Sequence, residues 1–295
     1  MRHQATLSRA VRVSGIGLHS GRHVDVVLHP ADADQGIVFH RTDVGTVVPA
    51  VSESAGLLDH ATSLGPKGRE VGTVEHLLSA LVGAGVDNLA VEVNGPELPI
   101  LDGSALPWLE QLHRAGLVRQ AAAKRVFVPS RLHALTGRNG ARLELRPARE
   151  LRVTYTIDFP HPAVGRQSLT IVVTPETYAR HVAPARTFGF LAEYEQLKAH
   201  GLARGASLSN CVVLGEDKVE GGTLRFADEF VRHKVLDLLG DLALVGRPIT
   251  GHIVASRAGH ALHVALAKAI RAEALAAEEA QETQEVPVAA GETGT

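Results

Sequence analysis

The stretch DEFVRHKVLDLLGDLALV, residues 228–245, carries the decisive pattern of this sequence. Its hydrophobic residues recur at helical spacing and surround most of the cylinder, so we predict a helix packed inside the protein. His233, Asp237 and Asp241 stand four residues apart, which places them within one polar stripe of about 80°, with Lys234 at its edge. Ionisable groups on a buried helix are costly unless they are paired or bound to a cation.

A histidine and a carboxylate one helical turn apart can both bind one metal ion. An interpretation without metal is also open, in which His233 and Asp237 form a buried ion pair and Asp241 stays in contact with solvent. The helix alone does not decide between the two.

A second apolar helix begins in the sequence TVEHLL, residues 73–78, and we predict it over residues 74–82. Adjacent residues of a helix diverge by about 100°, so Glu75 and His76 cannot both chelate one ion squarely. They can divide the work, with His76 binding a metal and Glu75 acting as a general base on a water beside it. A helix-opening glutamate stabilised by the helix dipole is the default alternative.

Length and composition limit the possible classes of protein. The 295 residues suffice for two ordinary domains, and a hydrophobic content of 45% supports well-formed cores. Basic and acidic residues number 30 and 32, so charge gives no sign of a nucleic-acid partner. The single cysteine, Cys211, excludes an internal disulfide and a thiolate zinc cluster. With no signal segment and no run of about 18 apolar residues, we expect a cytoplasmic protein without stable membrane insertion.

Strand-like alternation and helical periodicity are mixed along the chain, most strictly in residues 151–159, where every second residue is apolar. Short antiparallel strands combined with amphipathic helices indicate an α+β fold. We predict strands at 23–30, 88–94, 142–147, 151–159, 168–174 and 251–256, and helices at 74–82, 104–115, 175–181, 191–200, 228–245 and 260–275.

The two halves of the chain repeat one order of elements. A histidine in the opening part of a helix is followed by a glycine-containing loop and a strand, first after His76 and again after His233. We therefore predict two similar α+β domains from an internal duplication, residues 1–123 and 124–272. Packed face to face, they would bring both histidines to their interface, where ligand sites commonly form.

Residues 273–295 are rich in Ala, Glu, Gln and Thr and offer little to bury. We expect a frayed helix end and a disordered tail there.

Six motifs lie in order along about residues 2–272. They are SGIGLH at 14–19, TVEHL at 73–77, ELPILDGS at 97–104, ARTFGF at 185–190, DEFVRHKVLD at 228–237 and SRAGHAL at 256–262. Together they resemble the UDP-3-O-acyl-N-acetylglucosamine deacetylase family, the zinc amidases that commit bacteria to lipid A synthesis. The resemblance implies two α+β domains in which helices pack on antiparallel sheets, with the active site between them.

The resemblance also implies a Zn²⁺ cofactor held by His76, His233 and Asp237, with the fourth position open, as in catalytic rather than structural zinc sites. Glu75 would then be the general base that activates water. Thr187 would donate to the oxygen of the acetamide on which charge develops.

The remaining roles follow from the same resemblance. His260 matches the general acid that protonates the leaving amine, and Asp241 matches the carboxylate that orients it. The implied substrate contacts are Lys234 near the phosphates or sugar, Phe159 near the uracil, His19 and Leu18 on the sugar-nucleotide side, and Phe188 and Phe190 in a hydrophobic acyl-chain insert at about residues 187–210. An ordinary surface helix with a core-facing stripe is the alternative for that insert.

We therefore predict a monomeric enzyme that hydrolyses the N-acetyl group of an acylated UDP-amino sugar. One alternative is a zinc amidohydrolase acting on another N-acyl substrate. Another is a non-catalytic module that binds a sugar nucleotide and has a structural zinc, which would require a fourth protein ligand. Ser63 stands where we expect a cysteine in many relatives, and because a hydroxyl is a poorer zinc ligand than a thiolate, we expect no extra metal contact there.

Overall fold

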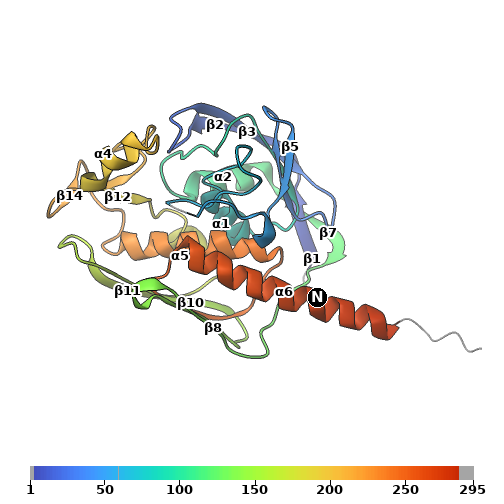
Figure 1. Cartoon of the computed structure of the whole chain (residues 1–295). Coiled ribbons are helices and arrows are strands. Elements are labelled where there is room, and N and C mark those ends of the chain that lie inside the picture. The colour runs from blue at the N-terminus through green and yellow to red at the C-terminus, as the bar shows by residue number, and fades with distance from the viewer. Residues whose placement is uncertain (1–2, 59, 286–295) are drawn as a thin grey trace, which may run out of the picture.

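The structure is a computed structural model that describes residues 3–58 and 60–285. Its elements form four layers, in which two five-stranded sheets lie on the outside and two pairs of helices lie between them (Figure 1). One continuous hydrophobic core runs through these layers. The α+β fold predicted from the sequence is confirmed.

The first sheet covers the outer side of helices α1 (Glu75–Ala84) and α2 (Leu106–Ala115) (Figure 1). Every neighbouring pair of its strands is antiparallel except β4 (Ile37–Arg41) and β6 (Leu89–Val93), which are parallel. Alternate residues of its second strand, such as Val24, Val26 and Leu28, are fully buried against the helices. The strand order is β2 (Val11–Ile16), β3 (His23–Pro30), β6 (Leu89–Val93), β4 (Ile37–Arg41) and β5 (Thr46–Pro49).

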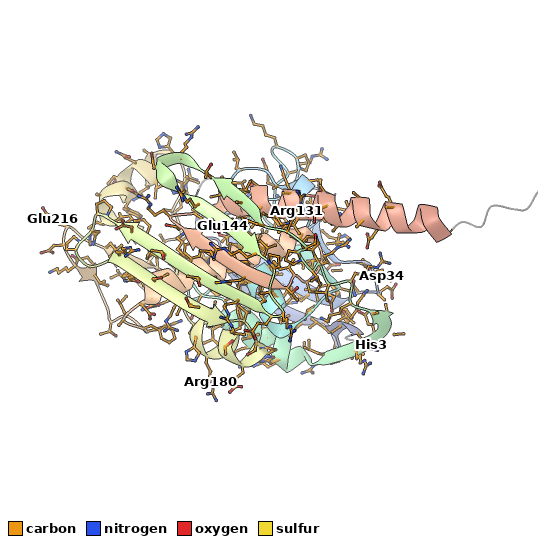
Figure 2. All side chains as sticks on the ribbon, turned by 90° about the horizontal axis from the view of Figure 1, so that it is seen from below. His3, Asp34, Arg131, Glu144, Arg180 and Glu216 are labelled. Carbon is orange, nitrogen blue, oxygen red and sulfur yellow. The ribbon has the colours of Figure 1, made fainter. Side chains whose placement is uncertain are left out.

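The second sheet packs on helices α5 (Glu229–Leu242) and α6 (His260–Glu285). The alternation predicted for residues 151–159 is present, with Val153, Tyr155 and Ile157 buried. Its other face is polar and carries Glu144 (Figure 2), which pairs with Arg146. The strand order is β11 (Gly165–Val172), β10 (Leu151–Phe159), β15 (Gly251–Ser256), β9 (Arg142–Arg146) and β8 (His133–Thr136), and only β10 and β15 are parallel.

The other elements of the described residues are two small sheets and several short helices. Strand β1 (His3–Leu7) pairs with β7 (Leu117–Ala123), and β12 (Phe188–Phe190), β13 (Val212–Leu214) and β14 (Val219–Glu220) form a three-stranded sheet. The remaining helices are α3 (Pro175–His181), α4 (Leu191–Ala199) and the short 3-10 helices Ser52–Ser54, Arg138–Gly140 and Ala243–Val245. No helix in the described part of the chain is sufficiently long and hydrophobic to span a bilayer.

Helix α6 continues past its predicted end at Leu275 to Glu285. Salt bridges from Arg247 and Arg125 to Glu278 hold the start of this extension against the body of the protein. These contacts join residues far apart in the sequence, so the composition of the segment could not indicate them. The rest of the predicted tail, residues 286–295, lies outside the described residues.

Candidate active site and metal centre

Helices α1 and α5 cross in direct contact, and this brings the two halves of the site together. The crossing depends on Gly240 of α5, which lies against the backbone of Glu75 at the start of α1. A methyl group at Gly240 would overlap the carbonyl oxygen of Glu75, so a larger residue would push the helices apart. Residues separated by more than half of the sequence therefore share one buried site.

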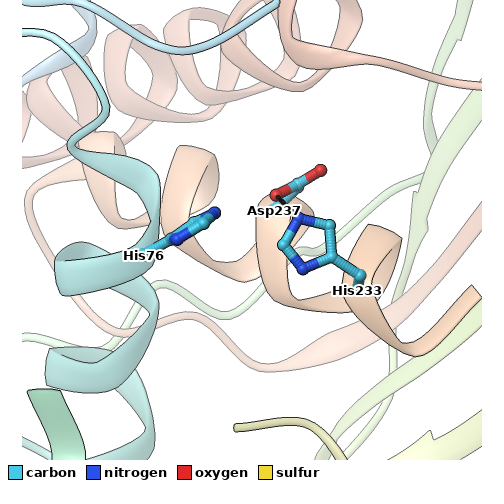
Figure 3. A group of neighbouring side chains, drawn as sticks. All are labelled: His76, His233 and Asp237. Carbon is cyan, nitrogen blue, oxygen red and sulfur yellow. Dashed lines mark ion pairs between the residues drawn. The ribbon is translucent and has the colours of Figure 1, made fainter. Parts of the chain in front are cut away.

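His76 of α1 points toward His233 and Asp237 of α5 (Figure 3). One ligand atom from each of these residues lies within 4.8 Å of the others. His233 uses Nδ1 to donate to the carbonyl oxygen of Ala185 at 3.0 Å, and its Nε2 lies 3.2 Å from Asp237 Oδ1. The second oxygen of Asp237 accepts from Lys234 Nζ at 2.8 Å. The ring nitrogens and carboxylate oxygen that could bind a metal ion therefore converge on one point.

The three residues fit a divalent metal ion. Nδ1 of His76 is buried and has no hydrogen-bond partner among the described residues, which is uncommon for a buried polar atom. Burial lowers the pKa of His76 to about 3 and also lowers that of His233, so both rings are neutral, the form that binds metals. Burial would raise the pKa of Asp237, but the ammonium group of Lys234 beside it keeps the carboxylate ionised. Two nitrogens and one oxygen are a typical donor set for zinc.

Glu75 is buried beside this group, and its Oε2 accepts from the backbone N–H of Thr62 at 3.1 Å. Burial raises its pKa to about 8, although the nearby His260 acts in the opposite direction. The hydroxyl of Thr62 donates to Asp241 Oδ1 at 2.6 Å. Thr62 thus links two predicted catalytic residues, and the sequence analysis did not identify it because it lies in a loop without periodic pattern.

Asp241 forms a second polar cluster with two histidines at the start of α6. Its Oδ2 lies 2.8 Å from Nδ1 of His260 and 2.8 Å from Nδ1 of His263. Burial alone would lower the pKa of His260, but Asp241 raises it to about 9. Asp241 is fully buried, so the interpretation that left it in contact with solvent is wrong.

A cavity of about 950 Å³ opens between the helices and the β12–α4 segment. Arg138 and His60 also line it, and the sequence analysis had not identified either residue. Asp241 lies behind His260, outside the lining. Of the residues predicted from the sequence, the lining contains Leu18, His19, Glu75, His76, Phe159, Thr187, Phe188, Phe190, His233, Lys234, Asp237 and His260.

One wall of the cavity is aromatic. Phe188 contacts Phe159 and Phe230 edge-to-face, with ring centroids 5.7 and 5.0 Å apart, and lies 6.3 Å from the ring of His233. Phe190, whose ring centroid lies 6.4 Å from that of Phe188, and apolar residues of α4 continue this wall. None of the residues of α4 is buried, so its apolar side chains face the cavity or solvent and not a core, contrary to the alternative for this insert.

Two backbone segments are fixed at the rim. The N–H of Thr187 donates to the carbonyl oxygen of Gly103 at 2.7 Å, which holds its side chain at the cavity. The carboxylate of Glu97 accepts from the N–H groups of His19 and Ser20 and so closes the turn that carries His19. Only glycine fits at Gly17, because a Cβ there would overlap the Glu97 carboxylate.

Comparison with known proteins decides the family. The model of the family described as UDP-3-O-acyl N-acetylglycosamine deacetylase matches residues 4–272. The chain belongs to this family. It is accordingly an enzyme of the deacetylase class, and the resemblance inferred from the six motifs is confirmed.

Curated relatives agree along almost the full length of the chain, and each of the following is named UDP-3-O-acyl-N-acetylglucosamine deacetylase. The protein of Myxococcus xanthus is 46% identical over 270 residues, covering 90% of this chain and 86% of the relative. That of Syntrophotalea carbinolica is 43% identical over 278 residues, covering 93% of this chain and 89% of the relative. That of Oleidesulfovibrio alaskensis is 48% identical over 267 residues, covering 88% of this chain and 86% of the relative.

Proposed function

We propose that this protein hydrolyses the N-acetyl group of UDP-3-O-acyl-N-acetylglucosamine to acetate and the free amine in a zinc-dependent reaction, the committed step of lipid A biosynthesis. The observation that carries the proposal is one cavity lined by Glu75, the His76–His233–Asp237 group and His260, and continued by an apolar wall. The names of the relatives supply the substrate.

His76, His233 and Asp237 would hold the zinc. When bound, the ion would supply Lewis acidity to the amide carbonyl and favour deprotonation of water. Among the described residues, the metal-ligating group contains no fourth protein side chain, which suits a catalytic rather than a structural metal.

The side chains of the protein account for the two proton transfers. Glu75 accepts a proton from the attacking water, the new C–O bond forms, and the hydroxyl of Thr187 donates to the oxygen on which negative charge develops. The C–N bond then breaks as His260 gives its proton to the nitrogen, because an amine cannot leave as an amide anion. Asp241 keeps His260 protonated and oriented.

The substrate contacts that we propose follow the chemistry of the lining. Lys234 lies near the phosphates or sugar, and His19 with Leu18 lies on the sugar-nucleotide side. Phe159 lies at the uracil, while Phe188, Phe190 and the rest of residues 187–210 enclose the acyl chain, at roughly 0.8 kcal/mol per buried methylene. We also propose a cytoplasmic monomer with domains at 1–123 and 124–272.

Acetate release by the purified, zinc-loaded protein tests the proposal. Four substrates are needed: the complete molecule, the molecule without UDP, the molecule without the O-acyl chain, and an unrelated N-acetyl sugar. We expect rapid release from the first and a large loss of kcat/KM when either group is missing. Equal rates on all four would identify a general amidohydrolase, and no release from any would identify a binding module.

A further inference from the structure

His263 is a fully buried histidine without a role in the proposed reaction. It nevertheless contacts the same carboxylate oxygen as the general acid His260. Its Nδ1 and that of His260 both lie 2.8 Å from the same oxygen, Asp241 Oδ2. The two rings are 6.2 Å apart and nearly perpendicular. An ionised carboxylate only accepts hydrogen bonds, so both rings must carry hydrogen on Nδ1.

The other side of His263 is also fixed. Its Nε2 lies 3.1 Å from the hydroxyl of Tyr155, whose oxygen is 2.8 Å from the carbonyl oxygen of Ala258. The phenol has one hydrogen, which it donates to Ala258, so the hydrogen on Nδ1 of His263 is set by Asp241, whose ionised carboxylate only accepts hydrogen bonds. The tautomer with Nδ1–H is thereby selected, and the donor to Asp241 is always present.

We propose that His263 is a positioning residue for His260, because by donating to Asp241 Oδ2 it fixes the carboxylate and weakens its hold on the His260 proton. A carboxylate that already accepts a strong hydrogen bond stabilises a neighbouring imidazolium less than a carboxylate that does not. His263 would therefore make the acid release its proton more readily. This inference rests on the proposed role of His260 as the general acid.

Other charged groups near His260 also influence its pKa. Of the carboxylates, Asp241 is the one hydrogen-bonded to the ring, while Asp237 and Glu75 act at longer range. The titratable groups that face the pair from the packed elements are Glu75 and His76 on α1, His233, Asp237 and Asp241 on α5, and Tyr155 on β10. A change confined to His263 leaves all of these in place.

The test is an NMR titration of the His260 ring in zinc-loaded protein, with its signal assigned by its absence in His260→Ala. In His263→Phe we expect the pKa of His260 to rise by about half to one pH unit, a fraction of the shift that a close charge partner produces. The basic limb of kcat/KM should move upward by the same amount, with KM little changed. An unchanged or lowered pKa of His260 would overturn the proposal, since a loosened Asp241 holds the proton less well.

Two further variants separate this effect from damage to the fold. In His263→Asn, the amide nitrogen can take the place of Nδ1 and donate to Asp241, so the titration should return most of the way to that of the wild type. Leu266→Ala removes buried volume from the same helix without touching Asp241, and it should lower stability while leaving the pKa of His260 unchanged. A His263→Asn titration that matches His263→Phe would count against the proposal.

The titration needs no substrate, so it separates the two hypotheses. A protein that releases no acetate but shows the expected shift would refute the proposed function and leave the coupling of His263 to His260 intact. A protein that releases acetate but shows no shift in the pKa of His260 would support the proposed function and refute the coupling.

Discussion

The site contains two clusters of the same composition, each with two histidines and one aspartate, and they differ in how their atoms are partnered. In the group formed by His76, His233 and Asp237, a buried ring nitrogen has no hydrogen-bond partner among the described residues. In the group around Asp241, the Nδ1 atoms of His260 and His263 are each hydrogen-bonded to the carboxylate at 2.8 Å. The same residue types thus give a metal centre in one place and a hydrogen-bonded acid in the other.

Helix α5 supplies the aspartate of both clusters from successive turns, so the neighbouring helix makes the difference. Helix α1 contributes His76, for which burial is the dominant influence and lowers the pKa to about 3. Helix α6 contributes His260, where Asp241 outweighs burial and raises the pKa to about 9. A neutral ring binds a metal, and a charged ring gives away a proton.

The largest effect should come from breaking the first cluster. We expect the double variant His233→Ala, Asp237→Ala to lose its zinc and its activity, because one remaining imidazole is a weak site. Metal analysis should give about one zinc per wild-type chain and almost none in the variant. X-ray absorption of the wild type should show nitrogen and oxygen at about 2.0–2.2 Å. A sulfur shell near about 2.3 Å, or full zinc retention in the variant, would contradict the assignment.

The next effect separates the base from the ligands. We expect Glu75→Ala to keep zinc and to lose about 10²- to 10⁴-fold in turnover, the usual contribution of a positioned base. Glu75→Gln, which keeps the size of the side chain, is the matched control and should lose nearly as much. Zinc content and single-turnover acetate release measure the two properties separately, and a variant without metal would place Glu75 among the ligands.

The sequence predicted the elements that are long and strongly patterned. Residues 151–159 alternate because one face of β10 packs on α5, and the helix at 228–245 is apolar because it lies between other layers. Nine strands of the described residues were not predicted, namely β1, β2, β4, β5, β7, β8, β12, β13 and β14. Of these, β1, β7 and β12 are clear examples. They are short or at an edge, and their pairing joins residues far apart in the chain, so local pattern says little about them.

For the site, the sequence indicated residues whose spacing shows one face of a helix, such as His233 and Asp237. The family resemblance added those on other elements, such as His260 and Thr187. Thr62 and His263 escaped both, because their roles consist of hydrogen bonds to Asp241 that arise only from the packing of α1, α5 and α6. The burial of Asp241 was misjudged for the same reason: the face of a helix that contacts another helix is not marked in its own sequence.

A smaller loss is expected from the second cluster, and it should depend on pH. His260→Ala should keep zinc and lower turnover by about 10²- to 10³-fold. Because Glu75 must be ionised and its pKa is raised to about 8, while His260 must be protonated and its pKa is raised to about 9, the wild-type rate should rise with pH through about 8 and fall as the pH rises through about 9. Protonated His260 also stabilises the folded state at pH values below the ordinary histidine pKa. This contribution to stability is lost as the pH rises above about 9.

Asp241→Asn is the partner variant, and it should do less damage than His260→Ala because the acid ring stays in place. Its basic limb should move to lower pH, since the carboxylate that holds the proton is gone. The pH–rate profile of both variants measures this. Turnover of His260→Ala close to that of the wild type would show that another group protonates the amine.

The smallest effect concerns Ser63, which lies beside Thr62 but does not line the cavity. Its hydroxyl donates to the carbonyl oxygen of Leu57 at 2.8 Å, and its backbone N–H donates to the same oxygen at 3.1 Å. Because the backbone bond remains, Ser63→Ala should lower the free energy of unfolding in urea by only about 0.5 kcal/mol and leave zinc content and turnover unchanged. Ser63→Cys carries the comparison further. Its sulfur would point toward Leu57 and away from the His76–His233–Asp237 group, so X-ray absorption should show no sulfur shell; a zinc–sulfur distance in that variant would mean that this loop can reach the metal.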